Sequence, residues 1–383
     1  MPEFSTLPPL SLYIHLPWCV KKCPYCDFNS HTFESSLPEV EYVNALIEDL
    51  EYQLPSIWGR RIVSVFIGGG TPSLFSVESI QKIISTVRSH LNCLPNMEVT
   101  MEANPGTVEQ EKFNGFYAAG INRLSIGVQS FDNEKLQALG RIHTAGEARN
   151  AVAVARKAGF KNINLDLMFG LPGQSVEQGL SDLQQSIDLK PQHISWYQLT
   201  IEPNTFFYSH PPLTPDDESV WELQQQGQKL LAEAGYHQYE ISAYATTAHQ
   251  CAHNLNYWRF GDYLALGAGA HGKITRADTG EIRRYWQSRK PADYMSAGAS
   301  NKTSGSEILA EDQIIFEFML NTLRLKQGFE ISEFEQNTGL KSELILTRCE
   351  KAIKVGLLQR KENGFAASEQ GYLFLNDLVN VFS

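Results

Sequence analysis

Residues 13–28 read YIHLPWCVKKCPYCDF, an apolar, strand-like run that passes directly into a cluster of cysteines. Cys19, Cys23 and Cys26 lie within eight residues, whereas the other three cysteines of the chain are scattered. The first ten residues lack the basic-then-apolar layout of a secretory signal, so we expect a cytoplasmic, reducing compartment. Clustered thiols in such a compartment indicate metal binding, and the spacing predicts a metal site in the loop after the first strand.

Three neighbouring thiolates suit more than one kind of site. An ordinary 4Fe–4S cluster takes four cysteines, so a trio leaves one iron open to another ligand. A structural zinc ion would need a fourth protein ligand, for which His15 and His31 are the nearest candidates. On the residues alone, the zinc site and three unligated surface thiols both stay open.

The composition of the 383-residue chain is that of a folded globular protein, with 42% hydrophobic and 20% charged residues. Its net charge of −11 disfavours a large sequence-independent nucleic-acid surface, which needs a basic field. No run approaches the roughly 18 apolar residues of a membrane span. We therefore expect that the chain neither binds nucleic acid nor spans a membrane.

Short apolar runs alternate with amphipathic stretches over the first two thirds of the chain. The predicted strands cover residues 11–16, 62–67, 98–102, 123–128, 162–168 and 193–201. The predicted helices between them cover residues 39–54, 76–91, 108–119, 145–158 and 175–189. This rhythm of about 30 residues implies parallel pairing with right-handed crossovers. Six units predict an α/β fold built on a partial (β/α)6 TIM-like barrel, with a doubly wound sheet as the alternative.

A smaller C-terminal helical, winged-helix-like domain is predicted after the barrel. Residues 216–234 predict a further helix and residues 238–244 a strand, and the small polar stretch 296–306 predicts a linker. Later helices are expected at 308–325, 331–338, 342–355 and 371–382, with a hairpin at 356–367. The predicted domains are the barrel over 1–240, a barrel extension over 241–300 and the C-terminal domain over 301–383.

Polar residues and glycines stand at the carboxyl ends of the predicted strands, where parallel sheets carry their active sites. Burying Asp166 among apolar neighbours costs several kcal/mol unless the carboxylate is paired or faces a ligand. Each such residue alone could be a structural hydrogen-bonding group. Together with the thiols, they predict a ligand site at this end of the sheet.

The cysteine stretch resembles the radical S-adenosylmethionine superfamily. In that family a 4Fe–4S cluster sits on three cysteines, and its open iron chelates the amino and carboxylate groups of S-adenosylmethionine. The resemblance implies that Cys19, Cys23 and Cys26 hold the cluster. It implies a site for S-adenosylmethionine lined by Tyr13, Tyr25, Gly69, Gly70, Thr71, Glu102, Gln129, Arg141 and Asp166.

Longer segments resemble the oxygen-independent coproporphyrinogen III oxidase-like branch of this superfamily. They are EANPG from Glu102, SIGVQSF from Ser125, NLDLMFGLPG from Asn164 and YQLTIEPNT from Tyr197. The branch includes a dehydrogenase and heme chaperones. The dehydrogenase pattern has another cysteine where this chain has Phe28, and a substantial extension ahead of the first strand, where this chain has a dozen residues.

The segment His253–Trp258 is similar to the HNxxYW motif of the heme chaperones, in which the histidine is implicated in heme binding. A neutral imidazole is a common axial ligand of heme iron, and Cys251 is a second candidate. A packed structural histidine stays open as the alternative. The resemblance implies a chaperone that binds heme, with oxidative decarboxylation of coproporphyrinogen III as the alternative function. The residues leave open whether S-adenosylmethionine is turned over.

Several partners are implied by the same resemblance. The first is a heme-acceptor protein, which by analogy with the family belongs to the respiratory chain. The others are an electron donor such as flavodoxin and a second copy of this chain. Lys21 and Lys22, between the first two cysteines, could steer an acidic electron donor or be ordinary solvated charges.

Overall fold

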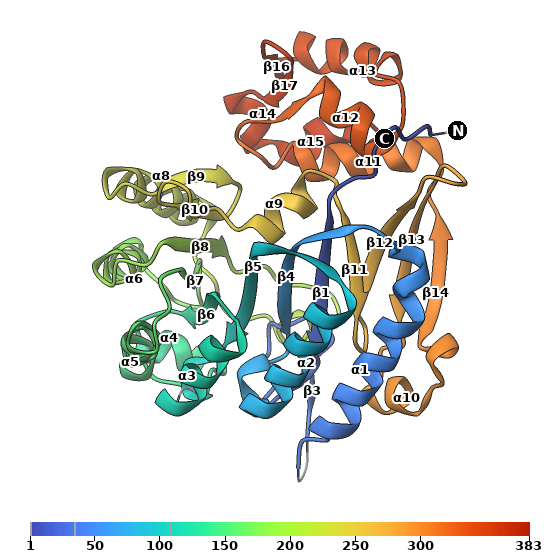
Figure 1. The fold of residues 1–383 in the computed structure, drawn as a ribbon. Coiled ribbons are helices and arrows are strands. Elements are labelled where there is room, and N and C mark those ends of the chain that lie inside the picture. The colour runs from blue at the N-terminus through green and yellow to red at the C-terminus, as the bar shows by residue number, and fades with distance from the viewer. Residues whose placement is uncertain (1, 34–35, 108) are drawn as a thin grey trace.

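A twelve-stranded sheet is the framework of the computed structural model, which describes residues 2–33, 36–107 and 109–383. Figure 1 shows helices along the outside of this sheet and a smaller helical unit beyond one end of its strands. The strand order is β14-β13-β12-β11-β1-β4-β5-β6-β7-β8-β10-β9. Since β14 and β9 are edge strands, the sheet forms a partial rather than a closed barrel.

The six predicted strands are confirmed as one parallel block in the middle of the sheet. They are β1 (Leu10–Leu16), β4 (Arg61–Gly69), β5 (Asn92–Ala103), β6 (Arg123–Gln129), β7 (Ile163–Phe169) and β8 (His193–Gln198). Their near-continuous apolar runs are buried on both faces, as parallel strands under covering helices require.

The covering helices also agree with the predictions. They are α1 (Glu39–Gln53), α2 (Val77–His90), α3 (Gln110–Ala119), α5 (Ala145–Lys157), α6 (Val176–Asp188) and α8 (Asp217–Glu233). Thr144 with Glu147 and Ser175 with Gln178 form capping boxes that fix where α5 and α6 begin. Val108, the predicted first residue of the third helix, lies outside the described residues. The short helix α4 (Asn133–Ala138) was not predicted.

The prediction of one continuous strand at 238–244 is wrong, because the structure has two strands there. It is a hairpin of β9 (His237–Glu240) and β10 (Ala243–Ala245), with β10 antiparallel to β8. The Glu240 carboxylate accepts hydrogen bonds from the backbone N and side-chain Oγ of Ser242, at 3.0 and 2.9 Å. These bonds stabilise the turn that breaks the run into two strands.

The linker predicted at 296–306 is also wrong. Residues 262–308 add four strands to the sheet beyond β1. They are β11 (Asp262–Leu266), β12 (His271–Arg276), β13 (Glu281–Gln287) and β14 (Thr303–Ile308). Ser296 ends the helix α10 (Pro291–Ser296), residues 299–301 form a short 3-10 helix, and the small polar residues from Thr303 onward belong to β14, an exposed edge strand. A Cβ at Gly305 would collide with the Trp286 ring, so the glycine serves strand packing.

The C-terminal unit matches the predicted winged-helix-like arrangement of helices and a small sheet. Its elements are α11 (Glu311–Thr322), β15 (Phe329–Glu330), α12 (Ile331–Thr338), α13 (Glu343–Lys354), β16 (Leu358–Arg360), β17 (Gly364–Ala367), α14 (Glu369–Leu373) and α15 (Leu375–Asn380). The last helix, predicted as one, is two helices that meet at Phe374. Its core also contains Phe260 and Ile282 from the sheet side. The domain bounds 1–240, 241–300 and 301–383 stay a prediction.

No helix among the described residues combines the length and apolar character needed to cross a bilayer.

Candidate functional site

A cavity of about 480 Å³ opens at the carboxyl ends of the parallel strands, a size typical of small-molecule sites. All three clustered cysteines line it. So do most of the other predicted site residues, namely Tyr25, Gly69, Gly70, Thr71, Glu102, Gln129, Arg141 and Asp166. Because the ends of parallel strands meet at one edge, residues far apart in sequence converge here.

The cysteine loop is pinned to the sheet by backbone hydrogen bonds. It begins in β2 (Trp18–Cys19), which pairs in parallel with β3 (His31–Thr32) and so closes the loop on itself. The backbone N of Thr71 donates to Trp18 O at 2.8 Å, and Asn29 Nδ2 donates to Ala268 O at 2.9 Å. These contacts give the thiols a defined position at the rim of the cavity.

Gly69 and Gly70 are required for this close packing. Gly69 has a φ of 115°, and a Cβ there would lie 2.6 Å from the His15 ring. A Cβ on Gly70 would lie 2.5 Å from the carbonyl oxygen of Trp18. Gly70 therefore lets the cysteine loop lie against the end of β4, and Gly69 leaves room for the His15 ring of β1.

Each cluster cysteine has a polar side chain close to its sulfur. Thr71 Oγ1 donates to Cys19 Sγ at 3.5 Å, and Ser30 Oγ lies 3.8 Å from Cys26 Sγ. Burial raises the pKa of the Cys19 and Cys26 thiols, an effect that these hydroxyls partly oppose. The Arg141 guanidinium donates through Nη1 to Cys23 Sγ at 3.5 Å and through Nη2 to Gly127 O at 2.8 Å.

The donor set fits an iron–sulfur cluster. Among the described residues, no three His, Cys, Asp or Glu side chains converge closely enough to hold a single metal ion. A 4Fe–4S cluster does not require that convergence, because each thiolate binds a different iron. Soft thiolates with a neighbouring guanidinium suit such a cluster, and the adjacent cavity leaves room for a further ligand.

Two carboxyl groups face the cavity beside the cysteines. Glu102 accepts a hydrogen bond from the Gly69 N at 3.0 Å. Burial, together with the charge of Asp166, raises the pKa of Glu102 to about 7. Burial also raises the pKa of Asp166, against hydrogen bonds from Ser125 and Asn164. Two poorly solvated carboxyls favour a ligand with positive charge, as the amino and sulfonium groups of S-adenosylmethionine carry.

Several residues that line the cavity were not among the predicted site residues. Ser125, Ser195 and Tyr197 all face the cavity, and Tyr197 donates to Gln129 Oε1 at 2.9 Å. The signal was present in the strands, because Ser195 and Tyr197 are two residues apart and therefore share one face of β8.

Tyr13 is not among the residues that line the cavity, and its part in the S-adenosylmethionine site stays a prediction. It lies in the middle of β1, where it is half-buried between fully buried neighbours. Its hydroxyl lies 2.9 Å from His15 Nδ1, and its ring stacks on that of Phe66 at 6.3 Å between centroids.

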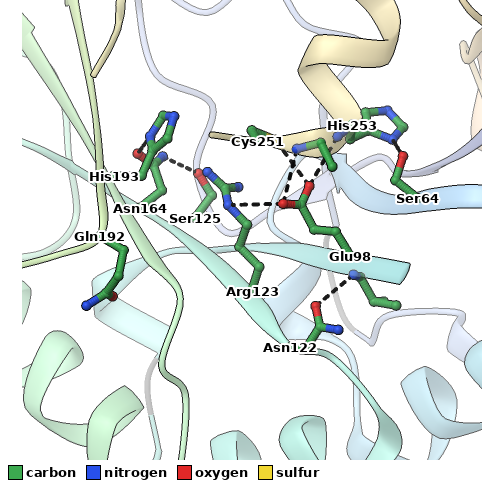
Figure 2. Close-up of polar contacts among 12 residues, drawn as sticks. Ser64, Glu98, Asn122, Arg123, Ser125, Asn164, Gln192, His193, Cys251 and His253 are labelled. Atoms are coloured by element: carbon green, nitrogen blue, oxygen red, sulfur yellow. Dashed lines mark hydrogen bonds and ion pairs between the residues drawn. The ribbon is translucent and has the colours of Figure 1, made fainter. Parts of the chain in front are cut away.

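His253 does not line the cavity either. It belongs to the short helix α9 (Ala252–Trp258), which lies against the amino halves of β1 and β4 (Figure 1). Its Nδ1 is 3.2 Å from Ser64 Oγ, as Figure 2 shows, and its ring centroid is 5.1 Å from that of Phe66. Burial lowers the pKa of His253 to about 3, so the imidazole is neutral. Heme ligation by His253 stays a prediction.

Cys251, the second candidate ligand, is buried at the start of the same helix. Its Sγ donates to Glu98 Oε1 at 3.4 Å, and burial raises the pKa of its thiol to about 12. The thiol is therefore protonated at neutral pH, unlike the thiolate that binds heme iron.

Two known protein families match separate regions of this chain. Residues 13–184 match the radical SAM superfamily, and residues 309–374 match the HemN C-terminal domain. The solved structure of coproporphyrinogen III oxidase (HemN) from Escherichia coli superimposes with a TM-score of 0.82 at 23% identity. It covers 98% of this chain and 90% of that protein, and shows the common fold.

Curated relatives are more similar in sequence. The heme chaperone HemW of Haemophilus influenzae is 50% identical over 386 residues, and that of Escherichia coli K12 is 50% identical over 376 residues. Each match covers 98% of both chains. HemW of Bacillus subtilis is 34% identical over 384 residues, covering 97% of this chain. Identity of this extent over the full length shows that the chain belongs to the HemW family of radical S-adenosylmethionine proteins.

Proposed function

We propose that this protein is a heme chaperone, which binds heme, a 4Fe–4S cluster and S-adenosylmethionine and passes heme to acceptor proteins. The observation that carries the proposal is the cavity that brings three thiols and two half-buried carboxyl groups together. The full-length identity to proteins named heme chaperone HemW supports the chaperone function over the dehydrogenase alternative.

In this proposal Cys19, Cys23 and Cys26 hold the cluster. When bound, the cluster supplies a one-electron reductant and an iron with an open coordination position. Glu102 and Asp166 receive the cationic groups of S-adenosylmethionine, and the Arg141 guanidinium offsets the negative charge of the thiolates. Gln129, held by Tyr197, offers a polar amide on the same wall.

His253 is the proposed axial ligand of heme. Its imidazole is neutral and can donate an electron pair to iron without first losing a proton. Because the ring is buried against Ser64 and Phe66, ligation requires α9 to move away from β4.

The remaining partners belong to the same proposal. A flavodoxin-like donor would approach Lys21, which lies at the cavity rim, while Lys22 Nζ donates to Phe28 O at 3.2 Å and steadies the cysteine loop. A heme acceptor of the respiratory-chain type, a homodimer and a cytoplasmic location complete the proposal.

Anaerobic reconstitution tests the cluster. We expect close to four irons and four sulfides per chain, on the stoichiometry of a 4Fe–4S cluster. Cys23→Ser should lose most of this iron, whereas Cys93→Ser, which changes a cysteine outside the cluster, should retain it. Equal iron in both variants, or zinc in place of iron, would contradict the assignment.

Heme titration and a substrate assay of the same preparation test the function. We expect a stable heme complex with a shifted Soret band, and transfer of that heme to the apo form of a b-type cytochrome. A Soret band unchanged in His253→Ala would reject His253 as the ligand. Formation of protoporphyrinogen IX from coproporphyrinogen III would overturn the chaperone function in favour of the dehydrogenase.

A further inference from the structure

A continuous series of buried polar groups connects the cavity to the helix that carries His253. It starts at Asp166, which lines the cavity. The Asp166 carboxylate accepts hydrogen bonds from Ser125 Oγ and Asn164 Nδ2, each at 2.8 Å. Figure 2 shows Ser125, Asn164 and His193 side by side in this part of the sheet.

The middle of the series has a fixed direction. Asn164 Oδ1 accepts from the backbone N of Ser195 at 3.0 Å, which sets the orientation of the amide. His193 Nδ1 lies 2.6 Å from the same oxygen and must therefore donate to it. Since burial keeps His193 neutral, with its pKa well below the ordinary value, its Nε2 accepts from the Tyr239 hydroxyl at 2.8 Å.

The far end of the series is the beginning of α9. Tyr239 Oη accepts a hydrogen bond from the backbone N of Cys251, the N-cap residue of α9, at 3.2 Å. Every link from Cys251 through Tyr239 and His193 thus donates in the direction of Asp166. Hydrogen bonds aligned in this way polarise one another, so a change of charge at one end alters the strength of the whole series.

A second group of contacts holds the same turn of α9. The Glu98 carboxylate accepts from the backbone N atoms of Ala252 and His253, both at 3.2 Å (Figure 2). It is balanced by Arg123, whose Nε lies 3.8 Å from Glu98 Oε2. The position of His253 therefore depends on polar contacts at the start of its helix.

The segment that these contacts hold is bounded by unusual backbone. Ala248 and Phe260, on either side of α9, have φ values of 65° and 61°, which residues with a Cβ rarely adopt. Such conformations persist only where surrounding contacts hold them. The contacts around the segment 249–259 therefore contribute to holding it in its observed position.

We propose that this series couples the cavity to His253, so that S-adenosylmethionine binding beside Asp166 loosens the start of α9 and exposes His253 to heme. The coupling rests on the proposed function, since it takes S-adenosylmethionine as the ligand of the cavity. A cationic group next to Asp166 competes with Asn164 and Ser125 for the carboxylate, and so weakens the aligned bonds. By linkage, heme on His253 must strengthen the binding of S-adenosylmethionine by the same factor.

Hydrogen–deuterium exchange of the reconstituted full-length protein tests the coupling without heme. We expect saturating S-adenosylmethionine to raise the exchange rate of peptides covering residues 249–260 by at least about threefold. Tyr239→Phe removes only the linking hydroxyl and should abolish this response. The matched control is Tyr236→Phe, which removes a buried hydroxyl that donates to Pro191 O at 2.7 Å and should keep the response.

Two results would overturn the coupling: no response of 249–260 in the wild type with S-adenosylmethionine bound, or a full response in Tyr239→Phe. If Tyr239→Phe does not fold, His193→Gln interrupts the series one link nearer the cavity and must abolish the response as well. Equilibrium dialysis of the same samples separates the two proposals. Absence of S-adenosylmethionine binding would contradict the proposed function and the coupling together, whereas binding without a response would contradict the coupling alone.

Discussion

Glu102 combines a cavity-facing position with a carboxyl group that is hard to ionise, because its pKa is raised from 4.5 to about 7 by burial and by Asp166. An acid whose pKa rises on folding stabilises the folded state below its unfolded pKa, and this contribution is lost as the pH rises from about 4.5 to about 7. We therefore expect cofactor-free Glu102→Gln to be more stable than wild type at pH 8, by on the order of 2 kcal/mol, and little different at pH 4.5.

Denaturant unfolding of the cofactor-free chains at the two pH values measures this difference. Glu111→Gln, which changes a carboxyl group at an exposed position of α3, is the control. An equal difference at both pH values for Glu102→Gln would show that folding does not raise the pKa of this carboxyl group.

Arg141 is expected to tune the cluster, since its Nη1 lies 3.5 Å from Cys23 Sγ. Removing a positive charge and a hydrogen bond to sulfur makes reduction of a cluster less favourable. Arg141→Met should lower the midpoint potential by on the order of tens of millivolts, with unchanged iron content. Arg141→Lys keeps the charge and should shift the potential less. A redox titration followed by electron paramagnetic resonance decides, and an unchanged potential in Arg141→Met would contradict the role.

Most of the residues that line the cavity could be predicted one by one from the sequence. Polar residues at the ends of apolar strands have few structural reasons to be there. Tyr13 is outside the cavity lining, and its part in the S-adenosylmethionine site stays a prediction. Heme ligation by His253 rested on a resemblance, which carries no information on the contacts with Ser64 and Phe66 that bury the ring.

The junction between β4 and the cysteine loop is the element most sensitive to added volume. A methyl group at Gly70 would press on the backbone of Trp18, so we expect Gly70→Ala to lower the free energy of unfolding by about 2 kcal/mol. Iron incorporation should fall with it, because the loop carries the thiols. Gly298→Ala, which meets nothing within 4 Å, is the control. Thermal unfolding and iron analysis of both variants measure the effect, and wild-type behaviour of Gly70→Ala would contradict the role of this contact.

Helices and strands were predicted well where their periodicity was strong, as in α1 and α6. The errors fell on short elements. The β9–β10 turn depends on Glu240, the β14 strand depends on pairing with β13, and neither contact is visible in local composition. A polar, glycine-containing run reads as a linker until its partner strand is known.

The sheet and the C-terminal unit share apolar contacts, so we expect them to unfold together. Ile282 lies on β13 but is fully buried in the C-terminal core, at 0% exposure. Ile282→Ala should cost about 2–5 kcal/mol, and Ile282→Val only about 0.5–1.5 kcal/mol. Circular dichroism and tryptophan fluorescence should report one coincident transition in both variants. Separate transitions would show that the two parts fold independently.

For the whole molecule, the alternation of strands and helices predicted the parallel block but not the order of the sheet. The strands β11–β14 add to β1, far from β10 in the sheet although β10 directly precedes α9 and β11 in the chain. Contacts between segments this distant depend on packing, which sequence periods do not encode.

The composition of β14 has a consequence for how the protein behaves in concentrated solution. An open sheet offers unpaired backbone groups along its outer strands, and such strands promote intermolecular aggregation when they are apolar and flat. Here the outer strand reads Thr-Ser-Gly-Ser-Glu-Ile and is mostly exposed. Its small hydroxyl side chains and single charge discourage stacking of one molecule on the next. Engineering this strand toward valine and isoleucine would be an effective way to make the protein insoluble.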